Sequence, residues 1–281
     1  LESDLAAGQL LDAIFEPETP INSLPEVVGQ LIGHGPKHRS ALRGRLVHNP
    51  DRTDGSPPFV IVDRYGGIQR YIEPVSNIDL EAFRVINEFF NRESGIYGFT
   101  VTPAFRFQLA PVSYEMPPPT PGQFSPAAIA WWSLKMRWWA WKMDFSDDLV
   151  QPDIQMFVQY HSLNGNNEVG ISVGMRKGRY GIVKAYARDA LQPQNMVVFT
   201  HEMLHVLGAT DKYVLSTGEP IFPHGFAYPD KRPLFPQQKA EIMGGRIPLS
   251  SYESVMPDSL EYCRIGRLTA EEIGFYAQLL P

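Results

Sequence analysis

The sequence predicts an α+β fold in which helices pack on a twisted mixed sheet, preceded by a small β-rich unit. Two observations indicate this architecture. From residue 77 onward, segments of helical periodicity alternate with short β-prone segments. Before residue 76, short β-prone segments are separated by turn residues. We therefore expect an N-terminal unit over residues 1–75 and a main domain over residues 76–281.

The composition is that of a globular protein with a sizeable core. The 281 residues are 43% hydrophobic and 20% charged, with a formal net charge of -6. This acidic balance gives no indication of nucleic-acid binding, which normally needs a basic surface. No segment reaches the roughly 18 consecutive apolar residues of a membrane span. The single cysteine, Cys263, excludes a disulfide within the chain and is expected to be a small buried side chain.

The N-terminal unit is expected to combine short helices with a small antiparallel sheet. Ser3 is placed to cap a first helix, and Pro17 would end it. Residues 38–75 contain three β-prone segments joined by turn residues, and we interpret them as an antiparallel β unit. The predicted strands are residues 41–48, 59–64 and 68–72.

The main domain is expected to contain helices and strands in alternation. Apolar residues recur at helical spacing over residues 77–91, where Asn77 or Asp79 could act as the cap. A helix from Ser125-Pro126 to about residue 143 holds all five tryptophans on more than one face, which favours burial. Thr269 and Glu272 form a capping box that predicts a last helix. The predicted strands lie within residues 97–109, 153–161, 169–175 and 180–187.

The segment from Thr200 to Tyr213 carries the strongest chemical signal. His201 and His205 are four residues apart on a predicted helix, so both imidazoles face the same side and can reach one metal ion. Glu202 lies beside them, where it could accept a proton from a bound water. The helix is expected over residues 195–207, with Asn195 as its cap.

A third protein ligand must come from outside this helix face. Catalytic zinc has three protein ligands and leaves a fourth position for water. Gly208 can adopt a positive φ, so the helix can end there and the chain can turn sharply. Asp211, three residues later, could then return to the ion, and we assign it as the third ligand.

The pattern H-E-x-x-H-x-x-G-x-x-D over residues 201–211 resembles the signature of the metzincin clan of zinc endopeptidases. It is closest to the branch, including snapalysin-like enzymes, in which aspartate is the third ligand. The resemblance implies a methionine-containing turn beneath the zinc, for which Met243 is preferred over Met256. It also implies a catalytic role for Tyr213. Lys212 and the proline-rich loop after it are not part of this signature.

Two other residues remain alternatives as the third ligand. Glu241 could take that place as a glutamate does in thermolysin-like enzymes, where the ligand comes from a later helix. His224 lies in the loop after Asp211 and could bind either the metal or a substrate.

The resemblance implies a zinc-dependent endopeptidase that acts on a peptide or protein substrate. In this mechanism Glu202 activates a zinc-bound water that attacks the peptide carbonyl, and Tyr213 helps to stabilise the oxyanion. Because such proteases are often exported and the chain starts at Leu1 rather than methionine, an extracytoplasmic location is expected.

An alternative function is a non-catalytic one. The chain could be a metal-containing binding or structural protein that acts through its N-terminal β unit. However, a structural zinc site usually has four protein ligands, often thiolates, and this sequence contains one cysteine.

Overall fold

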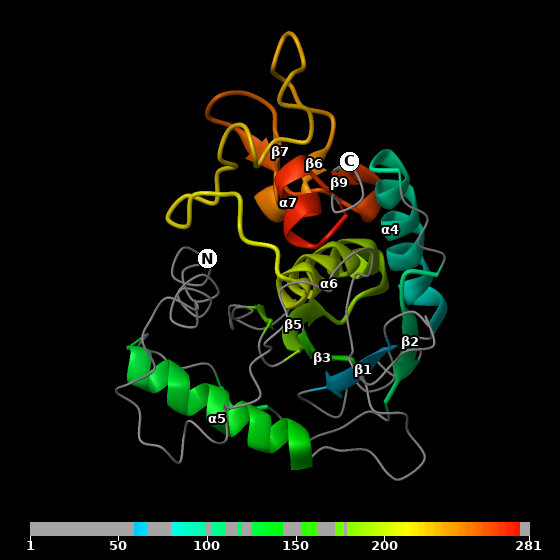
Figure 1. Cartoon of the computed structure of the whole chain (residues 1–281), viewed down its shortest axis with the longest axis vertical. Helices are drawn as coiled ribbons and strands as arrows, with labels where there is room; N and C mark the ends of the chain where they lie inside the picture. Colours follow the sequence, from blue (N-terminus) through cyan, green and yellow to red (C-terminus); the bar gives the residue numbers. More distant parts are fainter. Residues whose placement is uncertain are drawn as a thin grey trace.

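A five-stranded mixed sheet, with helices packed against it, forms the framework of this α+β protein (Figure 1). The computed structural model describes residues 59–66, 80–98, 103–110, 117–119, 125–142, 153–161, 172–176 and 179–275. The expected helices near the N-terminus, the strands at 41–48 and 68–72, and the caps Asn77 and Asp79 lie outside these residues.

The sheet has the strand order β2-β1-β3-β5-β4. Neighbouring strands run parallel from β2 through β5, whereas the edge strand β4 is antiparallel to β5. This arrangement confirms the predicted mixed sheet. The strands are β1 (Phe59–Gly66), β2 (Arg106–Leu109), β3 (Ile154–His161), β4 (Val173–Met175) and β5 (Tyr180–Tyr186).

Strand β1 corrects the prediction of an antiparallel unit over residues 38–75. It lies inside the main sheet, where Val60 pairs in parallel register with Phe107 of β2 and Ile154 of β3. Its partners therefore come from much later in the chain. The β-propensity of a short segment shows that it can form a strand but not which strand it will pair with.

Helices cover both faces of the sheet. On β3, Met156 and Val158 belong to the buried core shared with α4 and α6. The alternate residue Phe157 points to the other face, where its ring centroid lies 4.8 Å from that of Trp139 on α5. The helices are η3 (Leu80–Phe83), α4 (Arg84–Ile96), α5 (Pro126–Lys142), η4 (Asp189–Leu191), α6 (Gln192–Leu207) and α7 (Arg267–Glu272).

Helix α5 is only partly buried, unlike the prediction. Ser125 caps it as expected, since its Oγ accepts a hydrogen bond of 3.2 Å from the Ala128 amide. Trp132 and Trp139 are buried, but Trp131 and Trp138 are 60% and 59% exposed. Each pair is separated by seven residues, so each occupies one side of the helix. Among the described helices, none is long and apolar enough to cross a membrane.

The C-terminal segment packs against the side of α6 that faces away from the sheet (Figure 1). The predicted capping box is wrong, because α7 begins after Gly266 and Thr269 lies inside it. The Thr269 hydroxyl instead donates a 2.7 Å hydrogen bond to Glu241. The segment consists of β6 (Ala240–Glu241), η5 (Ile242–Gly244), β7 (Ile247–Pro248), β8 (Ser254–Val255), η6 (Leu260–Tyr262), β9 (Cys263–Arg264) and α7.

The contact between β4 and α6 depends on Gly174. A Cβ atom at this position would lie 2.2 Å from the backbone oxygen of Glu202 and 2.6 Å from the Cβ of His205. Neither atom belongs to the movable end of a side chain. Glycine therefore allows the edge strand to approach the helix that carries the HExxH motif.

We predict that Gly174→Ala will destabilise the protein by about 1–3 kcal/mol, the usual cost of overpacking. The reason is that α6 and β4 must separate. Urea denaturation would measure this change. Gly95→Ala is the control, because nothing lies within 4 Å of its added Cβ in α4. That variant should be neutral or up to about 1 kcal/mol more stable. Equal stability of Gly174→Ala and the unmodified protein would contradict the prediction.

Candidate metal centre

Helix α6 supplies the first part of the site and is anchored at both ends. It begins at Gln192, so Asn195 is not its cap. The Asn195 side chain instead bonds the backbone of Tyr186, accepting from its N–H at 3.0 Å and donating to its carbonyl at 2.9 Å. At the other end, Gly208 has a φ of 111° and its amide bonds to the carbonyls of Leu204 and His205. The predicted glycine stop is confirmed.

Three possible ligand atoms converge beyond this stop. Oδ1 of Asp211 lies 3.1 Å from Nε2 of His201 and 3.2 Å from Nε2 of His205. The two Nε2 atoms are 3.2 Å apart. Ligands bound tetrahedrally to zinc at its usual bond lengths lie about 3.3 Å from one another. The spacing therefore suits a small cation held by His201, His205 and Asp211.

Backbone carbonyls orient both imidazoles. Nδ1 of His201 lies 2.9 Å from the Ile242 oxygen, and Nδ1 of His205 lies 2.9 Å from the Ala209 oxygen. A carbonyl can only accept, so each Nδ1 carries the hydrogen. In the neutral ring this leaves the lone pair on Nε2, the atom that points toward the other ligands.

The charges of the site are strongly coupled. Burial raises the pKa of Asp211, but the two histidines outweigh it and hold that pKa well below its usual range. Burial lowers the pKa of His205, but Asp211, together with Glu202 and the Ala209 carbonyl, outweighs burial and raises that pKa to about 10. The aspartate is therefore an anion that attracts positive charge to the two imidazoles, a place that a divalent cation could take.

Glu202 is buried beside this cluster, with 7% of its surface exposed. Burial raises its pKa above the ordinary value, although His205, His201 and a backbone hydrogen bond from Gly174 act in the opposite direction. A carboxyl group with a raised pKa is a better proton acceptor near neutral pH than an ordinary surface glutamate.

Tyr213 also lies at the site. Its ring stacks on His201 with centroids 6.2 Å apart and an interplanar angle of 29°. The side chain is 5% exposed. Burial and the nearby carboxylates of Asp211 and Glu202 raise the pKa of Tyr213, so the phenol stays protonated and can donate a hydrogen bond.

The turn that contains Met243 contacts α6 on the side that faces away from the sheet. Met243 is fully buried, and the Ile242 carbonyl next to it holds His201. The Met243 carbonyl accepts a 2.8 Å hydrogen bond from the Lys212 amide. Met256, the other candidate for this turn, is 39% exposed. Of the two methionines, Met243 is therefore the one whose turn contacts the candidate ligands.

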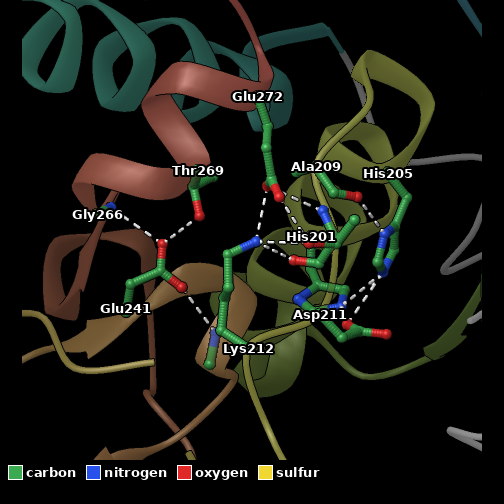
Figure 2. A network of polar contacts seen from close by, with 11 residues as sticks. His201, His205, Ala209, Asp211, Lys212, Glu241, Gly266, Thr269 and Glu272 are labelled. Carbon is green, nitrogen blue, oxygen red and sulfur yellow. Dashed lines mark hydrogen bonds and ion pairs between the residues drawn. The ribbon is translucent and has the colours of Figure 1, made fainter. Parts of the chain in front are cut away.

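Glu241 has a different function from the ligand role considered for it. It is fully buried and accepts hydrogen bonds from the Gly244 amide at 2.8 Å, the Gly266 amide at 2.9 Å and the Thr269 hydroxyl at 2.7 Å (Figure 2). It thus joins the η5 turn to the start of α7. His224 is exposed, and neither residue belongs to the converging ligand group.

Sequence comparison identifies no relative of this protein. No protein-family model matches the chain, and no curated protein is similar to it in sequence. The chemistry of the site is therefore inferred from its own geometry and from the H-E-x-x-H-x-x-G-x-x-D pattern.

Three residues that support the site are missing from the sequence-based prediction: Thr210, Lys212 and Glu272. Lys212 stood out only because it is not part of the H-E-x-x-H-x-x-G-x-x-D pattern. The sequence pattern around Glu272 was misleading, because Thr269 and Glu272 together have the spacing of a capping box. The contacts of Glu272 with Thr210 cross a separation of 62 residues, which local patterns do not reveal.

We predict that Asp211→Asn will weaken zinc binding by at least roughly 10- to 100-fold, because an anionic ligand is lost. This is the effect that losing a residue hydrogen-bonded to a metal ligand usually has, and losing the ligand itself should cost no less. Glu241→Gln should retain zinc affinity within a few-fold. It should nevertheless lose about 1–3 kcal/mol of folding stability, because a buried hydrogen-bond acceptor is replaced. Competition with a chromogenic chelator and thermal unfolding measure the two effects. The ligand assignment would be wrong if Glu241→Gln lost zinc and Asp211→Asn kept it.

Proposed function

We propose that this protein is a zinc-dependent endopeptidase with a metzincin-like catalytic domain, in which His201, His205 and Asp211 hold the ion. The main support is the convergence of three ligand atoms at 3.1–3.2 Å beside a buried Glu202. Three protein ligands leave a coordination position for water, which is the arrangement of catalytic rather than structural zinc. The mixed sheet and the helix that carries the motif agree with this class of enzyme.

Each residue has a defined part in the proposed reaction. Zinc, when bound, would supply Lewis acidity that lowers the pKa of a water molecule and polarises the peptide carbonyl. Glu202 accepts a proton from that water as it attacks the carbonyl carbon. It then delivers the proton to the leaving nitrogen, and the C–N bond breaks. The protonated Tyr213 hydroxyl donates a hydrogen bond to the carbonyl oxygen as negative charge develops on it.

The position of Glu202 favours this role. It precedes His205 on the same rigid helix, and the backbone of Gly174 on β4 bonds its carboxylate. A base held by a helix and a strand keeps its position relative to the ligands on that helix. This requirement for fixed geometry is general in proton-transfer catalysis.

We predict that Glu202→Gln will keep its zinc but lose about 10²- to 10⁴-fold in kcat, the contribution of general acid–base catalysis. Glutamine preserves the shape of the side chain but cannot accept the proton. Hydrolysis of a mixed library of quenched fluorescent peptides, together with zinc content, would measure the effect. Glu271→Gln, on an exposed face of α7, is a matched control and should be fully active.

Two outcomes would count against the proposal. Undiminished hydrolysis by Glu202→Gln would remove the assigned base. Zinc binding by the unmodified protein without chelator-sensitive cleavage of any library peptide would instead favour the non-catalytic alternative.

We predict that Tyr213→Phe will lower kcat by about 10²-fold or more, as removal of one oxyanion donor does. The ring that stacks on His201 is preserved, so the melting temperature should stay near that of the unmodified protein. Because the hydroxyl also hydrogen-bonds Asp211, kcat is measured at saturating zinc. Steady-state kinetics on a peptide cleaved by the unmodified enzyme would measure kcat and KM separately. An unchanged kcat would show that the phenol only packs against the ligand.

A further inference from the structure

The carboxylate of Glu272 holds the chain on both sides of Asp211. Its Oε2 accepts hydrogen bonds from the Thr210 amide at 3.0 Å and from Lys212 Nζ at 2.7 Å. Its Oε1 accepts a bond of 2.7 Å from the Thr210 hydroxyl. Figure 2 shows Glu272 reaching from α7 toward Lys212 and the backbone next to Asp211. The proposed ligand is thus the central residue of a segment fixed at both neighbours.

Lys212 completes this arrangement from within the segment. Its side chain is 4% exposed, and the ammonium group uses its three donors on the Thr210 carbonyl at 2.6 Å, the Thr210 hydroxyl at 2.8 Å and Glu272. Its backbone is equally constrained. The Lys212 amide donates to Met243, and its carbonyl accepts from Ile221 at 2.7 Å. The polar groups of the residue after Asp211 are therefore all engaged.

The location of this largely buried ion pair, in which the Lys212 and Glu272 side chains are 4% and 20% exposed, indicates why it is present. A buried pair adds little net stability, because removing two charges from water offsets their attraction. Asp211, however, is the one proposed ligand that α6 does not carry, since it follows the stop at Gly208. An irregular segment would otherwise sample many conformations, and fixing them on metal binding costs conformational entropy. Holding the segment in advance removes that cost.

We infer that Glu272 and Lys212 are positioning residues that set the metal affinity of the site by fixing Asp211 in reach of both imidazoles. This inference rests on the proposed function, because it assumes that the three residues hold a divalent cation. It gives α7, which contributes no ligand, an influence on the metal affinity through the segment that carries Asp211. Neither residue touches the ion, and both act through the backbone that flanks Asp211.

The test measures the zinc affinity of the full chain by chelator competition, well below the melting temperature of each variant. Glu272→Gln should bind zinc about 10- to 100-fold more weakly, which is the usual effect of losing a residue that supports a metal ligand without binding the metal. Lys212→Met removes the ammonium group and keeps most of the stem, and should act in the same direction. Because the two residues act as one unit, the double variant should lose less than the product of the two factors.

Glu271→Gln is the matched control for charge and location. It removes one carboxylate from the same helix. Glu271, however, pairs with Arg267 at 3.2 Å on an exposed face, and among the described residues its side chain makes no hydrogen bond or ion pair with residues 210–212. Its zinc affinity should stay within twofold of the unmodified protein. The visible absorption spectrum of the Co²⁺-loaded protein gives a second measure, because it reports the ligand geometry. It should change in Glu272→Gln and Lys212→Met only.

A purely structural role gives a different result. If both variants melted at lower temperature but kept the zinc affinity and the Co²⁺ spectrum of the unmodified protein, the contacts would serve only to pack α7. The inference would then be wrong while the proposed function stood. If the unmodified protein failed to bind zinc at all, the proposed function would fail and this inference with it.

Discussion

The approach of the Asp211 carboxylate to the imidazoles of His201 and His205 is the interaction on which the site depends. The two imidazoles are set by the geometry of one helix, but the carboxylate belongs to irregular chain beyond it. Several features of the fold serve to bring it back. Gly208 ends the helix with a positive φ, and the Ala209 carbonyl beside it orients His205. The same turn that redirects the chain therefore also orients the His205 imidazole.

The C-terminal segment supports the site through two carboxylates. Glu241 is fully buried, and Glu272 is partly exposed. Glu241 ties the η5 turn to α7, and that turn orients His201 through the Ile242 carbonyl. Glu272, at the other end of α7, holds the residues around Asp211. Helix α7, with only six residues, thus links the contacts that hold His201 to the contacts that hold the segment around Asp211. The geometry around both His201 and Asp211 therefore depends on where α7 is packed, although this helix is short.

The parts of the structure that depend on local sequence could be predicted. The β-prone segments at residues 153–161 and 180–187 form β3 and β5 as predicted. The spacing of His201, His205, Gly208 and Asp211 brought three candidate ligands together, because neighbours on a helix and a glycine stop are set by nearby residues. Pairings between distant segments could not be predicted. The parallel pairing of β1 and the contact between Lys212 and Glu272 depend on how the whole chain packs. Thr269 misled for the same reason, since its partner is Glu241 rather than its own helix.

The order of these residues along the chain has a consequence for biosynthesis. A ribosome releases the HExxH helix and Asp211 well before α7, because Thr210 and Glu272 are 62 residues apart. The nascent chain therefore carries His201, His205 and Asp211 before Glu272, which fixes the neighbours of Asp211, has been made. If these residues hold a metal ion as proposed, tight metal binding would become possible only when the C-terminal segment has folded onto α6. Loading with the ion would then be a late event that marks a completed fold.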